Sequence, residues 1–205
     1  MKTDYVDLYF MHRDNPEIPA GEFVDVLNDL REQGRIRAFG GSNWTKERFD
    51  EANTWARKNG RTGFAALSNN FSLARMINPP WAGCLASSTA EFRQWHEKTQ
   101  TPLLAWSSQA QGLFAPGRTD RNNPVGELAR CWHCPDNFER LDRCRELAER
   151  KGVHPMALAL AYVLHQSFPT FALIGPAGIS ETRSSFGALE IDLTPDELKW
   201  LECGD

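Results

Sequence analysis

The sequence predicts an α/β fold in which short parallel strands alternate with helices, and three observations support this prediction. Short apolar runs are followed by segments with helical periodicity. A small polar cluster follows each predicted strand, and no G-x-G-x-x-G pattern of an open dinucleotide-binding sheet follows the first one. Polar groups that successive strand ends deliver to one face are typical of a (β/α)8 TIM barrel. We therefore expect an incomplete barrel of about five β/α units.

The first half of the chain alternates in this way. Strands are expected at residues 4–12, 36–39 and 64–67. The first strand precedes a helix that Gly34 ends, and its apolar face carries Phe23, Val26, Leu27 and Leu30. The second precedes a helix that Thr45 caps and that Gly60 ends, with Phe49, Ala52 and Ala56 on its buried face. After the third strand, a helix begins at Ser88 or Thr89 and buries Phe92 and Trp95.

The second half contains two further strands, expected at residues 103–106 and 171–174. Between them lie a long loop over about 107–135 and two helices, at 137–151 and 155–165. A loop of this length without regular structure is usually a lid or a binding loop, so we expect it to set substrate specificity. A helix over 180–189 follows the last strand, and the capping box at 194–197 predicts a terminal helix.

Composition narrows the classes of function. The chain has 205 residues, 41% of them hydrophobic, which suits one partial barrel domain over residues 1–205. A net charge of −4 leaves no basic stripe for phosphate backbones, so we expect no nucleic-acid partner. No apolar run is long enough to cross a bilayer and no secretory leader is apparent, so we expect a cytoplasmic protein without membrane contact.

The five cysteines do not form a disulfide framework. The motif Cys131-Trp-His-Cys134 has three interpretations: a redox dithiol, half of a zinc site, or coincidence. Zinc would need two more ligands at suitable spacing, and a redox dithiol would follow a buried strand. Since neither feature is present, we favour coincidence and expect no metal.

The polar residues after each strand also have ordinary explanations. His12 closes the first apolar run and suits either a catalytic group or a structural histidine. Ser42 and Asn43 are equally consistent with a helix-capping turn, Trp106 with a core position, and Arg183 with a solvated helix face. Only the joint order of these residues favours a binding site.

In that order the sequence resembles the aldo-keto reductase family. The similarity lies in residues 3–12 (TDYVDLYFMH), 33–44 (QGRIRAFGGSNW), 68–75 (SNNFSLAR) and 174–201, and runs over nearly the whole chain. It implies strands 4–8 of a (β/α)8 barrel, with the N-terminal units missing. It also implies NAD(P)H-dependent hydride transfer to aldehydes or ketones, with NADP favoured and NAD as the alternative.

The resemblance assigns roles around the reacting end of the cofactor. His12 matches a histidine that orients and polarises the substrate carbonyl. Ser42 and Asn43 match the pair that hydrogen-bonds the nicotinamide carboxamide. Asn70 stands where a glutamine is usual, and Trp106 where an aromatic residue stacks on the nicotinamide ring.

It also assigns residues to the phosphates. Residues from Ser107 to Gly112 would lie along the pyrophosphate. The segment from Gly175 to Arg183 would enclose the adenosine phosphate end, where a helix N-terminus and an arginine suit a 2′-phosphate. Ser185 replaces a family asparagine.

The catalytic tyrosine, lysine and aspartate of the family belong to units upstream of residue 1. We therefore expect the isolated chain to be inactive, although its substrate class would be a small carbonyl compound or alcohol. The alternative is a non-catalytic remnant or subunit that keeps dinucleotide affinity or an interaction surface; thiol oxidoreduction ranks last. Open sheet edges further predict a marginal chain that forms homo-oligomers or joins a complementing N-terminal half.

Overall fold

A computed structural model describes residues 2–204 and contains one parallel sheet of five strands in sequence order. Every neighbouring pair is parallel, with Val6 opposite Ile36 at one edge and Leu103 opposite Thr170 at the other. The strands are β1 (Val6–Met11), β2 (Ile36–Ser42), β3 (Leu67–Ser68), β4 (Leu103–Ala105) and β5 (Thr170–Ala172). This arrangement confirms the predicted α/β class with parallel strands.

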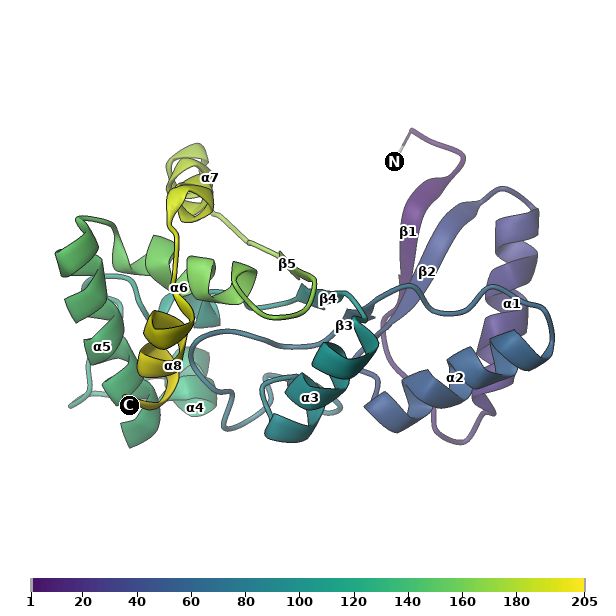
Figure 1. Ribbon diagram of the computed structural model, residues 1–205, viewed down its shortest axis with the longest axis horizontal. Helices are drawn as coiled ribbons and strands as arrows, with labels where there is room; N and C mark the ends of the chain where they lie inside the picture. The colour runs from purple at the N-terminus through teal and green to yellow at the C-terminus, as the bar shows by residue number, and fades with distance from the viewer. Residues whose placement is uncertain (1, 205) are drawn as a thin grey trace.

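Helices fill the connections between the strands. They are α1 (Ala20–Glu32), α2 (Lys46–Lys58), α3 (Ala90–Thr99), α4 (Gly126–Trp132), α5 (Pro135–Lys151), α6 (Pro155–Leu164), α7 (Ile179–Phe186) and α8 (Pro195–Cys203), with short 3-10 turns η1 (Ala110–Gly112) and η2 (Gly187–Glu190). In Figure 1, α1 and α2 lie beside β1 and β2 at one end of the molecule, whereas α4, α5 and α8 lie at the other.

Local sequence accounts for several helix boundaries. The Thr45 hydroxyl accepts a hydrogen bond from the Arg48 N–H and caps α2 as predicted. Thr89 caps α3, and Thr194 with Glu197 forms the predicted capping box of α8. The prediction for Val26 was wrong, because this side chain is 59% exposed. The buried face of α1 instead includes Ala20, Gly21, Val24, Leu27 and Asn28.

All five strands differ by one or more residues from their predicted limits, and β2 extends three residues further, to Ser42. The difference at β3 has a visible cause. Residues 64–66 run beside β2, but ladder pairing begins only at Leu67. A Cβ at Gly40 would lie 2.2 Å from the Ala66 carbonyl oxygen, so glycine permits this close backbone approach. β5 ends at Ala172, two residues before the predicted limit, although the Leu173 N–H still bonds to the Ala105 carbonyl.

The predicted long loop over 107–135 is wrong in part, because it contains η1 and α4. Likewise α5 begins at Pro135 rather than residue 137, and the helix predicted over 180–189 divides into α7 and η2. Proline at the first turn explains the earlier start of α5, since its missing N–H costs nothing there.

The apolar side chains form two buried clusters. One surrounds Phe39, Trp44 and Phe49 between β2, α1 and α2, and the other surrounds Trp132 and Leu158 in the C-terminal half. Both edge strands expose large apolar side chains, namely Tyr5, Leu8 and Tyr9 around β1 and Phe171 and Leu173 around β5. Among residues 2–204, no helix is long and apolar enough to cross a bilayer.

Candidate functional site

A cavity of about 910 Å³ opens beyond the C-terminal ends of β4 and β5. Its lining comes from the loops after β4 and β5, from α7 (Ile179–Phe186) and from the start of α6. The lining residues used below are Ser107, Gly112, Arg118, Gly175, Glu181 and Ser185. In open and closed parallel sheets, ligands bind in this position.

The loop after β4 is held in an unusual backbone conformation. Ser107, Ala110 and Gln111 have positive φ angles of 48°, 47° and 53°, and Gly112 follows with 88°. Such conformations cost energy in residues other than glycine and concentrate at ligand-binding loops. The Ser108 hydroxyl donates to the Leu173 carbonyl at 2.7 Å and ties this loop to the one after β5. The two walls of the cavity are therefore fixed to each other.

Four of the residues predicted to bind the cofactor line this cavity, and a hydrogen bond joins its two sides. Ser107 and Gly112 come from the first loop, and Gly175 and Ser185 from the segment after β5. The Gln109 amide donates to the Ser185 hydroxyl across the cavity at 3.4 Å. Arg183, in contrast, is exposed and does not belong to the lining.

The predicted amides lie in a second group at the ends of β2 and β3. Asn43 is left-handed, with φ of 57°, and is 7% exposed. Its Oδ1 accepts the Leu85 N–H at 3.0 Å, and its Nδ2 donates to the Ser42 hydroxyl at 3.1 Å. Ser42 in turn donates to the Ser68 carbonyl at 3.0 Å. Ser42 and Asn43 therefore hold their own strand ends together.

Asn70 and Trp106 continue this group. The Asn70 N–H donates to the Leu85 carbonyl at 2.9 Å, and its Nδ2 donates to the Trp106 carbonyl at 3.0 Å. Leu85, in a loop that the sequence did not single out, thus links Asn43 to Asn70, and Asn70 in turn bonds to Trp106. Asn70 Oδ1 and Trp106 Nε1 are buried without a hydrogen-bond partner in the structure. Buried orphan groups of this kind call for a ligand or a water.

His12 follows β1 directly and is exposed. It does not belong to the cavity lining beyond β4 and β5. The structure therefore places the predicted site residues in three places along the C-terminal side of the sheet (His12 after β1, the Asn43–Asn70–Trp106 group with Ser42, and the cavity), and it leaves Arg183 exposed on α7.

The cysteine motif does not have the character of a redox site. Cys131 is fully buried in α4, and burial raises the pKa of its thiol above the usual value, which opposes thiolate formation. Cys134 precedes α5 and is free, like Cys131. Within residues 2–204, no three histidine, cysteine or acidic side chains gather as a metal cluster.

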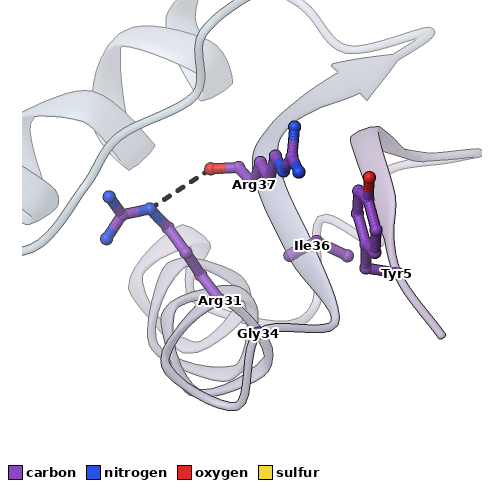
Figure 2. A pocket seen from close by; sticks show the side chains of 5 residues that line it. All are labelled: Tyr5, Arg31, Gly34, Ile36 and Arg37. Carbon is purple, nitrogen blue, oxygen red and sulfur yellow. Dashed lines mark hydrogen bonds between the residues drawn. The ribbon is translucent and has the colours of Figure 1, made fainter.

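A second hollow, of about 410 Å³, lies at the opposite ends of the strands. Figure 2 shows its lining of Tyr5, Arg31, Gly34, Ile36 and Arg37, with the Arg31 side chain bonded to the Arg37 carbonyl. The Arg37 guanidinium also lies 4.3 Å from the Tyr5 ring centre and pairs with Asp7. These contacts bind the Arg31 and Arg37 side chains to neighbouring groups of the protein, so we regard this hollow as structural.

Comparison with known proteins agrees with this architecture. The model of the aldo/keto reductase family matches residues 1–202. Versiconal hemiacetal acetate reductase of Aspergillus parasiticus is 26% identical over 206 residues, which cover 97% of this chain and 57% of that protein. An aldo-keto reductase of Alternaria alternata is 23% identical over 98% of this chain and 53% of its own length.

Solved structures show the same fold. An aldo/keto reductase from Klebsiella pneumoniae, in complex with NADP and acetate, superposes with a TM-score of 0.72 at 22% identity. That match covers 98% of this chain and 59% of the other. The chain therefore spans little more than half the length of the relatives and solved structures that it resembles.

Proposed function

Because the chain belongs to the aldo/keto reductase family, we propose that it is the dinucleotide-binding part of a carbonyl-reducing oxidoreductase. The cavity beyond β4 and β5 would hold the pyrophosphate and adenosine of a nicotinamide dinucleotide, either NADP(H) or NAD(H). The Asn70–Trp106 group would face the nicotinamide end. The partner would be a small carbonyl compound or alcohol, and the location the cytoplasm.

One observation carries this proposal: small residues from two neighbouring strand ends line a single cavity. Gly112 and Gly175 bring backbone rather than side chains to its walls, as a pyrophosphate requires. The Ser107 hydroxyl supplies a hydrogen-bond donor, and Arg118 supplies a positive charge; the Ser185 hydroxyl already donates to the Glu181 carbonyl. A volume of about 910 Å³ is in the range of cofactor sites.

The nicotinamide end fits less completely than the phosphate end. Trp106 is half-buried and offers an aromatic face, while Asn70 Oδ1 is an acceptor without a partner that suits an amide N–H. The amide of Asn43, however, is already bonded to Leu85 and Ser42. Contact between Asn43 and a carboxamide would require the Leu85 N–H to move.

When bound, the reduced dinucleotide supplies the hydride for carbonyl reduction. The protein must then orient the carbonyl and provide a proton. His12 is our proposed orienting group, but the three tyrosines of the chain are badly placed for proton donation. Tyr5 and Tyr9 lie on or before the edge strand β1, and Tyr162 is buried in α6. We therefore propose that the isolated chain binds the cofactor without catalysing reduction.

The second candidate function is a subunit or remnant that binds dinucleotide or another chain and performs no chemistry. It is favoured by the apolar side chains exposed at both sheet edges, where a complementing half or a second copy would pack. Turnover of an aldehyde by the purified chain would refute this second function and the predicted inactivity together.

A binding experiment tests the proposal. A Cβ at Gly175 would meet nothing within 4 Å, so there is room for a side chain at this position, which lines the cavity. We expect NADPH and NADH to quench tryptophan fluorescence in the parent chain, and Gly175→Leu to weaken binding about 100-fold by steric exclusion. Ala82→Leu adds the same side chain at an exposed loop position and should bind normally. Unchanged affinity in Gly175→Leu would contradict the proposal.

A further inference from the structure

The N-terminus of α7 forms one wall of the cavity, and the chain's own carboxylate occupies it. Glu181 is the third residue of α7, and its Oε2 accepts the Ala177 N–H at 2.7 Å. Both residues line the cavity beyond β4 and β5. The carboxylate is therefore held in front of the helix by a bond to Ala177, the residue before the N-cap Gly178.

This position is where an anion would otherwise bind. The first N–H groups of a helix lack partners within it and carry partial positive charge, which attracts phosphates and carboxylates. The Glu181 carboxylate bonds to the Ala177 N–H, which lies just before the helix, so a phosphate brought to the same helix end meets a negative charge. The negative charges of the phosphate and of Glu181 repel each other.

Arg118 is the arginine that lines the cavity. Arg118 lies on the opposite wall, beside Gly112, where its side chain is 3.6 Å from the point a Cβ there would occupy. That placement suits the pyrophosphate, which both forms of the cofactor share. Arg183, the arginine expected at a 2′-phosphate, does not line the cavity.

We infer that Glu181 makes this cavity select NAD(H) over NADP(H), by excluding the 2′-phosphate and accepting the ribose hydroxyl. Oε2 is bonded to Ala177, and Oε1 remains as an acceptor for the 2′-hydroxyl of the adenosine ribose. This inference rests on the proposed function, since it places the adenosine end at α7. The NADP complexes of the Klebsiella pneumoniae reductase concern that protein, and the charge at this wall decides the preference of the present chain.

The test compares dissociation constants for NADH and NADPH in the full chain, measured by isothermal titration calorimetry. We expect the parent chain to bind NADH about tenfold more tightly than NADPH. Glu181→Gln keeps the shape and removes the charge, so NADPH binding should strengthen until the two constants agree within about twofold. Glu181→Asp keeps the charge and should keep the preference for NADH.

Controls separate this effect from general charge and folding effects. Glu146→Gln removes a negative charge from the exposed side of α5 and should leave the ratio unchanged. Far-UV circular dichroism of each variant verifies that the helices are intact. A variant of Arg118, Arg118→Gln, should weaken NADH and NADPH binding by the same factor.

The possible outcomes are distinguishable. NADPH binding as tight as or tighter than NADH in the parent chain overturns the inference and leaves the proposed function standing. Loss of NADPH affinity alone in Arg183→Gln also overturns it, because the 2′-phosphate would then lie against that arginine. Binding of neither dinucleotide overturns the proposed function and this preference together.

Discussion

Asn137 joins the loop after β3 to the junction of α4 and α5, and its replacement by alanine should be costly. The side chain is fully buried. Its Oδ1 accepts the Arg75 N–H at 2.8 Å, and its Nδ2 donates to the carbonyls of Arg75 at 2.8 Å and Trp132 at 2.7 Å. Oδ1 also accepts a bond from the Arg140 guanidinium at 3.3 Å, so alanine at this position removes four bonds at once.

The magnitude follows from the groups left behind. An unsatisfied buried polar group costs about 1–3 kcal/mol. The Trp132 carbonyl accepts this bond in a buried environment, whereas the exposed Arg75 regains part of its bonding from water. We therefore expect Asn137→Ala to lower the free energy of unfolding by about 3 kcal/mol. For a chain of this size, that corresponds to a fall of about 10 °C in Tm.

Urea titration followed by circular dichroism measures this change. The matched control is Asn122→Ala, which removes an identical side chain from an exposed loop and should alter stability by less than about 0.5 kcal/mol. A loss below about 1 kcal/mol in Asn137→Ala would refute the reasoning. An equal loss in the control would refute it as well.

Two other predictions concern pH and association. Burial lowers the pKa of His96 below 6.5, although the Thr101 carbonyl opposes the shift. Below pH of about 6.5, the unfolded chain therefore gains a proton that the folded chain resists. The free energy of unfolding should therefore fall as the pH drops from about 6.5 through the pKa of His96 in the folded chain. In a plot of urea midpoint against pH, His96→Gln should flatten the slope over this range, and an unchanged slope would contradict the assignment. At the sheet edges, Leu8 and Phe171 are 38% and 56% exposed, so the purified chain should associate as its concentration rises. The double variant Leu8→Lys, Phe171→Lys should reduce this association, as measured by light scattering. A sharply melting monomer of the parent chain would count against it.

The elements governed by local sequence were predictable. Thr45 and Thr194 predict the starts of α2 and α8, because a threonine hydroxyl can accept a hydrogen bond from a free N–H group of the first turn. The short helix α4 was not predicted, because it has only seven residues, begins at a glycine and has no side-chain cap. Val26 was misplaced because several helical phases fit the same apolar residues, and only packing against α2 selects one.

The candidate site was likewise predictable only in part. The order of Ser42, Asn43 and Trp106 after successive strands could be recognised from the sequence. Leu85 could not, because its bond to Asn43 joins residues 42 positions apart and depends on the path of a loop. The role of Glu181 also required the structure. A glutamate in a first helical turn is common, and only the cavity in front of it makes its charge relevant to a ligand.

The most direct test of the account is a crystal structure of the chain grown with saturating NADH. We predict density for the pyrophosphate between Gly112 and Gly175, with the adenosine ribose hydroxyls beside Glu181. Density for the dinucleotide at any other place on the protein, or an empty cavity at saturating concentration, would contradict the account.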